Sequence, residues 1–192
     1  QVIFHCQIGE EEGYFNLGDV SSSICNKLIH RHPHVFKNVD IDMNKFDKTW
    51  EELKKEEKGE ATVTEGLQRI PEFLPALTKA EKIQHKAALV GFDWDNIGDV
   101  CKKVEEEYKE LLDECKSRNI KYIKEELGDL LFSIVNLARF LQVDPEEALN
   151  LTSKKFIKRF KFIEDNAKAM NKTLEDMTLD EMDKLWEKAK FQ

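Results

Sequence analysis

Apolar residues recur at the three- and four-residue spacing of an α-helix through most of this 192-residue sequence. No segment gives a convincing alternation of apolar and polar residues, the pattern of a half-buried β-strand. The sequence has only four prolines and eight glycines, so few positions force a helix to end. Helices joined by short turns pack as antiparallel neighbours. The sequence therefore predicts an all-α fold, an antiparallel helical bundle.

Capping and turn residues mark where several of these helices begin and end. Asp95 is expected to cap one helix, and the polar triplet at 117–119 forms the turn that ends it. Asp144 is a second expected cap, with Pro145 at the first helical position, where proline is favoured. Thr178 is expected to cap the last helix.

One segment is expected to lack a helix. Residues 59–75 contain glycine and proline and few periodic apolar residues, so they are predicted to be a loop or linker. The predicted helices cover residues 44–58, 76–90, 96–116, 120–141, 145–170 and 179–190.

Composition argues against several classes of partner. The net charge is −8, which disfavours a broad electrostatic surface for a nucleic acid polymer but allows a small anionic ligand that brings its own metal cations. No apolar run approaches the ~20 residues of a membrane helix. The first seven residues lack the basic start of a signal peptide, and the four cysteines form no CxxC pair. Reduced thiols and a cytoplasmic location are expected.

The predicted helix at 120–141 carries an unusual polar stripe. On a helical wheel Glu126, Asp129, Ser133, Asn136 and Phe140 fall in one narrow sector, and apolar residues surround them, so this helix should be substantially buried. A buried carboxylate without a counter-charge is costly, and a divalent cation would remove the conflict. The alternative is that the two acids form a solvent-exposed edge of the helix.

A second group of acids lies on the preceding predicted helix. By periodicity alone Glu107 and Glu110 would face solvent. However, the short turn makes the two helices adjacent and antiparallel, and Glu126 and Asp129 lie at a similar distance from that turn. Four converging carboxylates repel one another unless a metal lies between them. Oxygen ligands of this kind favour Mg²⁺ or Mn²⁺ over zinc.

Five motifs occur in order around these acids: GFDW (91–94), EEEYKE (105–110), EELGDLLF (125–132), VNLAR (135–139) and KKFIKRF (154–160). Together they resemble the MazG family of nucleoside triphosphate pyrophosphohydrolases, and the resemblance covers about residues 75–192. The family pattern, ExxE followed by ExxD, lies on two antiparallel helices of an all-α fold. The resemblance implies a homodimer that hydrolyses nucleoside triphosphates to monophosphate and pyrophosphate with Mg²⁺, or Mn²⁺ as a substitute.

The resemblance also implies roles for individual residues. The implied metal ligands are Glu107, Glu110, Glu126 and Asp129. Glu106 is a candidate to deprotonate the attacking water. The implied substrate-binding residues are Arg31, Lys155, Arg159, Trp186 and Lys190. A further family lysine falls near Tyr122, so that contact is either absent or supplied by Lys121.

These substrate roles agree with simple chemistry. Lys155 and Arg159 are four residues apart, on one helix face, and can screen the charge of a triphosphate. Trp186 can stack on a base of any identity, which suits broad base specificity. The alternatives are a solvated basic face for the two cations and ordinary packing for the tryptophan.

A weak internal repeat suggests a second domain. KLIHR (27–31) resembles KFIKR (155–159), and QVIFHCQ (1–7) then corresponds to SIVNLAR (133–139). The first copy would begin just past the equivalent of Asp129, without its own acidic helices. We therefore interpret residues 1–60 as the remnant of a first MazG-like domain plus a connecting helix, and residues 61–192 as the catalytic MazG-like domain.

Other functions fit the sequence less well. A helical interaction or dimerisation module that keeps the fold but is catalytically weak remains an alternative. A di-iron bundle needs ExxH motifs, and residues 103–132 contain no histidine. His30, His32 and His34 alternate and could hold zinc, but Pro33 favours a structural turn. Neither a P-loop nor a dinucleotide-binding glycine motif occurs.

Overall fold

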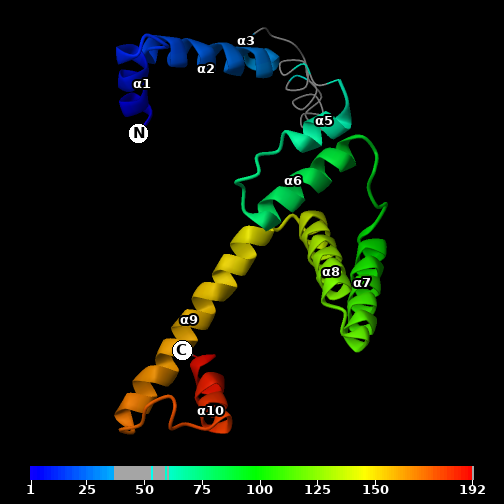
Figure 1. Cartoon of the computed structure of the whole chain (residues 1–192), viewed down its shortest axis with the longest axis vertical. Helices are drawn as coiled ribbons and strands as arrows, with labels where there is room; N and C mark the ends of the chain where they lie inside the picture. Colours follow the sequence, from blue (N-terminus) through cyan, green and yellow to red (C-terminus); the bar gives the residue numbers. More distant parts are fainter. Residues whose placement is uncertain (37–52, 54–58, 60, 192) are drawn as a thin grey trace. The chain divides into compact units, whose positions relative to one another are not determined.

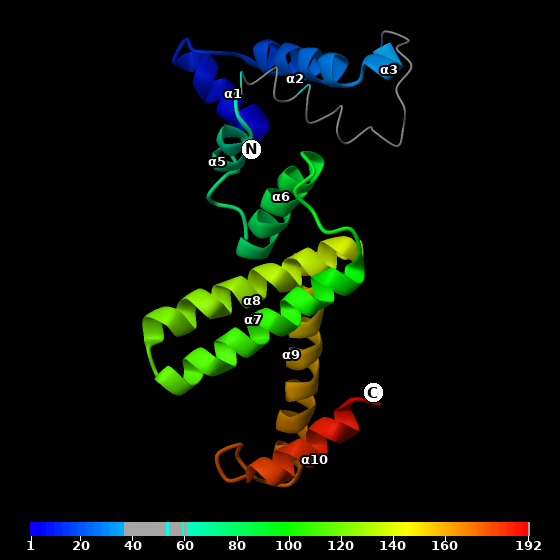
Figure 2. The same ribbon diagram turned by 90° about the vertical axis from the view of Figure 1, so that its right-hand side faces the viewer.

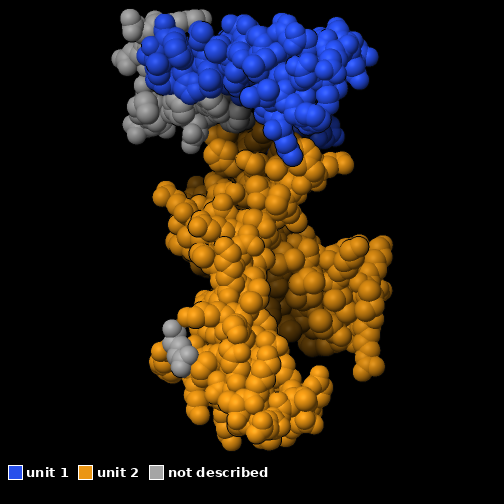
Figure 3. Space-filling view, turned by 90° about the vertical axis from the view of Figure 1, so that its left-hand side faces the viewer, with its two compact units in different colours: residues 1–69 blue, residues 70–192 orange. Residues whose placement is uncertain are grey.

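The computed structural model describes residues 1–36, 53, 59 and 61–191, and within them the secondary structure is helical, without strands (Figure 1). This confirms the predicted all-α class. The chain divides into two compact units, residues 1–69 and 70–192, which are coloured separately in Figure 3. None of the helices in the described part of the chain is long and apolar enough to span a lipid bilayer.

Unit 1 contains four described helices: α1 (Val2–Glu11), α2 (Leu17–Arg31), α3 (Pro33–Phe36) and α5 (Val63–Gln68). Asn16 begins α2 with a capping box, because its side chain accepts a hydrogen bond from the Asp19 amide and the Asp19 carboxylate accepts one from the Asn16 amide. A Cβ on Gly9 would lie 2.8 Å from the tip of the Phe15 ring, so a larger residue there would force the ring to move.

Helix α5 corrects the prediction that residues 59–75 form a loop or linker. The Thr62 hydroxyl accepts a hydrogen bond from the Glu65 amide at 3.1 Å, and the Glu65 carboxylate accepts one from the Ala61 amide at 2.8 Å. This reciprocal cap starts a helix of only six residues, which is too short for its apolar residues to establish a period. The predicted helix at 44–58 falls outside the described residues.

Unit 2 holds the acidic motifs. Its helices are α6 (Ala76–Leu89), α7 (Ile97–Ser117), α8 (Ile120–Phe140), α9 (Pro145–Ala169) and α10 (Leu179–Ala189). The prediction that Asp95 caps α7 is wrong by one residue, because Asn96 accepts the hydrogen bond from the Asp99 amide and also donates to the Asp99 carboxylate. Asp144 does cap α9, accepting bonds from the next two amides after Pro145.

Helices α7 and α8 form an antiparallel hairpin, side by side in both ribbon views (Figures 1 and 2). The predicted turn at 117–119 is confirmed: Arg118 ends α7 in the left-handed conformation, with φ of 55°, and Asn119 caps α8. The buried Gln84 of α6 donates a hydrogen bond of 2.7 Å to the Phe132 carbonyl, which attaches the hairpin to α6.

Helices α9 and α10 pack on each other around a separate apolar core. This core consists of Ile163, Ala167, Met177 and Leu185, with Phe162, Leu174, Met182 and Trp186 against it. In Figure 1, α9 leaves the end of α8 and diverges from the hairpin, and α10 folds back along it. The predicted cap at Thr178 is confirmed, because Thr178 and Glu181 form a capping box.

The cap of α10 gives a prediction about pH. A hydrogen bond from Lys172 and one from the Thr178 amide lower the pKa of Glu181 to about 2. A carboxylate whose pKa is lower in the folded than in the unfolded state stabilises the fold above its ordinary pKa, and this contribution disappears as the pH falls through the folded value. The urea midpoint of Glu181→Gln should therefore lie below that of wild type at neutral pH, and the gap should close between about pH 5 and pH 2.

Lys172→Met provides the matched test of the cause, since it removes the first partner of Glu181 while leaving the carboxylate in place. Its urea midpoint should fall below that of wild type at neutral pH by most of the amount seen for Glu181→Gln, and this difference should also close at low pH. If the difference in urea midpoint between Glu181→Gln and wild type stayed constant down to pH 3, the lowered pKa of Glu181 would not be its cause.

Candidate metal centre

The α7–α8 hairpin brings the predicted acids together. Glu107, Glu126 and Asp129 each offer one carboxylate oxygen, and the three atoms lie within 4.8 Å of one another. Glu106, Glu107 and Glu110 form a second such group, so Glu107 belongs to both. Oxygens this close can share one hard cation, which is the arrangement that the spacing of the motifs predicts. That they bind a metal remains a prediction.

The burial of these acids differs along the hairpin. Glu107 is only 6% exposed, Glu126 is half-buried, and Glu110 and Asp129 are exposed. Periodicity alone would place Glu107 toward solvent, whereas the pairing of the two helices predicts that it turns inward, and the structure shows it buried. Its side chain faces α8, since one of its carboxylate oxygens lies within 4.8 Å of those of Glu126 and Asp129.

The polar stripe of α8 divides into two halves. Ser133 is buried and its hydroxyl donates to the Leu130 carbonyl at 2.8 Å. Asn136 accepts hydrogen bonds from the Arg139 guanidinium at 2.9 and 3.0 Å. These two residues already have partners in the protein, so the oxygens available for a cation belong to Glu126 and Asp129.

The pKa of Glu126 reflects its partial burial and the repulsion from neighbouring carboxylates. Partial desolvation, and then the negative charges of Glu110, Asp129, Glu107 and Glu114, raise the pKa of Glu126 above its ordinary value. A raised carboxyl pKa means that the ionised group is held in an unfavourable environment. A divalent cation among these oxygens would reverse that repulsion. The donor set therefore fits a hard metal ion.

Lys103 is a residue of the site that the sequence reasoning missed. Its ammonium group lies 2.7 Å from both the Glu106 and the Glu107 carboxylates, and these partners strongly raise its pKa. It supplies one positive charge to the buried Glu107. The signal was present in the sequence, because Lys103 precedes the two acids by three and four residues, the spacing of helical ion pairs.

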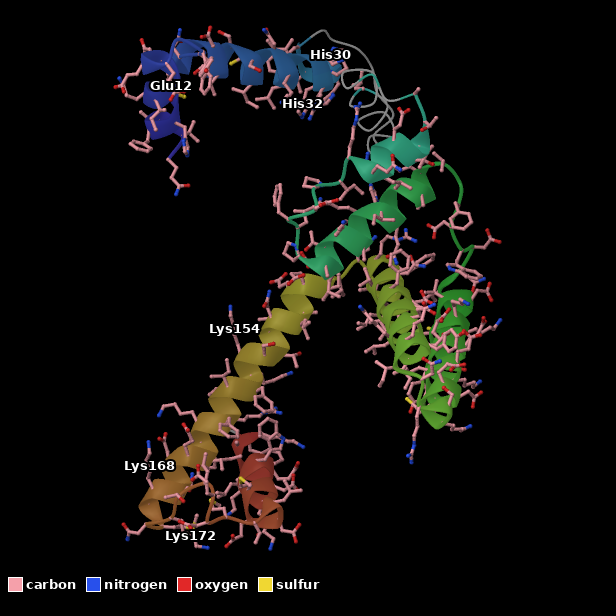
Figure 4. All side chains as sticks on the ribbon, in the orientation of Figure 1. Glu12, His30, His32, Lys154, Lys168 and Lys172 are labelled. Atoms are coloured by element: carbon pink, nitrogen blue, oxygen red, sulfur yellow. The ribbon has the colours of Figure 1, made fainter. Side chains whose placement is uncertain are left out.

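The predicted substrate-binding residues of unit 2 lie on α9 and α10. The Arg159 guanidinium is 5.5 Å from the centre of the Trp186 ring, and the Phe156 ring centre is 5.0 Å from it. Lys155 is exposed, as is its neighbour Lys154, which Figure 4 labels on α9. The structure thus brings Arg159 and Trp186 together and adds Phe156, which sequence reasoning did not single out.

Lys190 lies at the end of α10, where it forms an ion pair with Glu187. Because α9 diverges from the hairpin, the cations of α9 and α10 are carried away from the acids of the same chain (Figures 1 and 2). In the part of unit 2 that the structure describes, the basic residue that pairs with Glu107 is Lys103 and not one of the predicted binding residues.

Arg31 and the histidines belong to unit 1. Arg31 is the last residue of α2, and His32 follows as its C-cap, with its amide bonded to the Leu28 carbonyl. Figure 4 labels His30 and His32 near this helix end. The ring centres of His32 and His34 are 5.6 Å apart. In the part of the chain that the structure describes, the groups of potential metal ligands are the two acidic ones only.

The fold and the acids define an all-α protein with a candidate site for a hard divalent cation on a helical hairpin. Comparison with known proteins adds the family. The family described as the MazG nucleotide pyrophosphohydrolase domain matches residues 1–36 and 98–163. The second segment contains all four predicted metal ligands, and the first contains Arg31. The chain belongs to the MazG family.

Similar proteins cover nearly the whole chain. The nucleoside triphosphate pyrophosphohydrolase/pyrophosphatase MazG of Thermotoga maritima is 44% identical over 190 residues, which are 99% of this chain and 72% of the relative. The nucleoside triphosphate pyrophosphohydrolase of Escherichia coli K12 is 39% identical over 195 residues, 100% of this chain and 74% of the relative. The uncharacterized protein YabN of Bacillus subtilis is 48% identical, and the match covers 39% of its length.

Proposed function

We propose that this protein hydrolyses nucleoside triphosphates to the monophosphate and pyrophosphate in a reaction that depends on Mg²⁺, with Mn²⁺ as a possible substitute and with broad base specificity. The observation that carries the proposal is the meeting of Glu107, Glu126 and Asp129 within 4.8 Å on one hairpin of a MazG chain. The names of the Thermotoga and Escherichia relatives support the reaction class.

In this proposal each residue has one task. Glu107, Glu110, Glu126 and Asp129 would hold one or two Mg²⁺, which supply charge neutralisation of the phosphates and activation of water. Lys155, Arg159 and Lys190, with Arg31, would screen the remaining triphosphate charge, and Trp186 would stack on the base.

Glu106 is the proposed proton acceptor. It is exposed and belongs to the same acidic group as Glu107, so it would lie close to a metal-bound substrate. Lys103 keeps its carboxylate in place through a hydrogen bond of 2.7 Å. Glu106 could take the proton of the water that attacks the α-phosphorus.

We also propose a homodimer in which each copy completes the site of the other. Large apolar side chains on α8 and α9 are exposed in the single chain; those more than 40% exposed include Leu127, Leu131, Phe132, Ile134, Leu149, Leu151, Phe156 and Ile157. Such a surface is typical of an interface. A second copy that covered it could bring Arg159 and Trp186 of its own α9 and α10 to the acids of the first.

The rest of the proposal concerns domain organisation, cellular location and the size of the substrate. We propose that residues 1–60 belong to a first MazG-like domain and a connecting helix, in line with the separate family match at residues 1–36. The four cysteines are unpaired, as expected for a cytoplasmic protein. The net charge of −8 favours small nucleotides over nucleic acid polymers as substrates.

The direct test is product analysis. The protein is incubated with ATP, GTP, CTP and UTP in Mg²⁺ buffer, and monophosphate and pyrophosphate are quantified. Equal amounts of the two products from all four substrates would support the proposal. Release of inorganic phosphate with a nucleoside diphosphate would overturn the proposed reaction. No release at all would overturn it too and would favour a catalytically weak interaction module that keeps the fold.

Metal binding can also be measured without substrate. A ligand at about 100 times its dissociation constant stabilises a protein by about 2.7 kcal/mol, so saturating Mg²⁺ should raise Tm by roughly 5 to 10 °C. The Asp129→Asn variant should lose most of this increase. KCl at matched ionic strength is the control, and an equal increase with KCl would exclude a specific site.

A further inference from the structure

The α7–α8 hairpin has one closed end and one open end. The turn at Arg118 and Asn119 joins the helices at the closed end, whereas α7 begins and α8 finishes at the open end. Glu107 is ten residues from Ser117 at one end of α7 and eleven from Asn96 at the other. The acids therefore lie midway along the hairpin, where the distance between the helices depends on both ends.

An ion pair crosses the open end. Arg139, in the last turn of α8, binds the carboxylate of Asp93, which lies in the segment between α6 and α7. The side chain of Arg139 is 16% exposed and that of Asp93 is 28% exposed, so the pair is largely shielded from water. Such a pair is worth more than an exposed surface ion pair.

Both partners are held by further contacts. Asn136 accepts two hydrogen bonds from Arg139, whose guanidinium also lies 4.9 Å from the centre of the Phe140 ring. The Asp93 oxygen that binds Arg139 also accepts a hydrogen bond of 2.9 Å from the Trp94 amide. The guanidinium fork thus joins the polar stripe of α8 to the backbone that leads into α7.

We propose that the Asp93–Arg139 pair is a positioning clamp, which holds the open end of the hairpin so that the carboxylates of Glu107, Glu126 and Asp129 keep the spacing needed for a divalent cation. The inference rests on the proposed function, because it assigns the pair a task at that metal site. Arg139 is about 15 Å along the helix from Asp129, at 1.5 Å per residue, and Asp93 binds Arg139, so neither clamp residue touches the cation. They act through the separation of the two helices.

The clamp is tested by metal affinity, measured apart from turnover. Mn²⁺ binding to the full chain is titrated by electron paramagnetic resonance for wild type, Asp93→Asn, Arg139→Gln and the double variant. Changes in residues that orient metal ligands typically weaken binding 10- to 100-fold. Each single variant should raise the Mn²⁺ dissociation constant about tenfold, and the double variant should be no weaker than either, because all three lack the same pair.

Two controls separate positioning from general stability. Ile163→Val removes one buried methyl group from the α9–α10 core and should lower Tm while leaving Mn²⁺ affinity unchanged. Arg139→Lys keeps the positive charge but not the planar, forked guanidinium. Its Mn²⁺ affinity should therefore lie between those of wild type and Arg139→Gln.

The outcomes are distinct. Mn²⁺ affinity that is unchanged in Asp93→Asn and Arg139→Gln, in a wild type that binds Mn²⁺ and releases pyrophosphate, overturns the clamp and leaves the proposed function intact. A wild type that neither binds Mn²⁺ nor releases pyrophosphate overturns both. Single-variant losses that add in the double variant overturn the pairing.

Discussion

Replacing Glu107 with glutamine is expected to slow pyrophosphate release by roughly 100-fold or more. Glu107 is shared by the two acidic groups and is the most buried of the four predicted ligands, so no other carboxylate can take its position. Its amide replacement has nearly the same shape but offers a neutral, weaker ligand. Glu126→Gln and Asp129→Asn should each show a loss of similar size.

The matched control for these variants is Glu125→Gln. Glu125 precedes Glu126 on α8, is exposed, and belongs to neither acidic group, so its replacement removes the same charge without removing a ligand. It should retain nearly full activity. If Glu126→Gln and Asp129→Asn kept the wild-type rate at saturating Mg²⁺, the proposed metal site would be wrong.

Mixing two inactive variants should restore activity. Glu126→Gln lacks one predicted metal ligand but keeps the substrate-binding residues of α9 and α10. Arg159→Ala lacks one of those binding residues but keeps all four predicted metal ligands. If each site takes its acids from one copy and its cations from the other, a mixed dimer contains one site with both parts intact. Random exchange of subunits should then recover about a quarter of the wild-type rate from a mixture in which each parent alone is nearly inactive.

This complementation distinguishes two arrangements of the site. If the acids and Arg159 met within one copy, every site in a mixed dimer would carry one of the two substitutions, and the mixture would stay inactive. Sedimentation equilibrium of wild type and of each variant checks that the proposed dimer forms in all of them. A mixture of Glu126→Gln with Asp129→Asn is the matched control, because these two residues lie on the same helix and should not complement each other.

The sequence predicted helix starts best where only one residue in the segment was suited to be the N-cap. Asp144 before Pro145, and Thr178 three residues before Glu181, each mark a helix start without an alternative, and both caps are present. At Asp95 and Asn96 two good capping residues are adjacent, and only the hydrogen bonds to Asp99 decide between them. Helix α5 was missed because six residues give no measurable period.

For the candidate site, spacing predicted which acids meet but not which polar groups are already paired. Ser133 and Asn136 share the stripe of Glu126 and Asp129, yet they are bonded to Leu130 and Arg139. Lys103 was missed because helical ion pairs are common on exposed surfaces, and its link to a buried carboxylate depends on how α8 covers α7.

Burial was the property that a single sequence predicted least well. Helix α8 was expected to be substantially buried, but in the isolated chain Leu127, Leu131 and Phe132 are 42–47% exposed. An apolar face indicates that something must cover it, whereas the identity of the covering element depends on tertiary and quaternary contacts.

All four acids come from one hairpin, and this bears on the order of folding. Glu107 and Asp129 are only 22 positions apart in the chain, so the loop that must close to gather them is short and its entropic cost is small. Contacts between residues near in sequence form early, before those that join distant segments. Pulsed hydrogen exchange during refolding should find the amides of α7 and α8 protected together and ahead of the proposed dimer, so that the acids of the proposed metal site gather before the enzyme is complete.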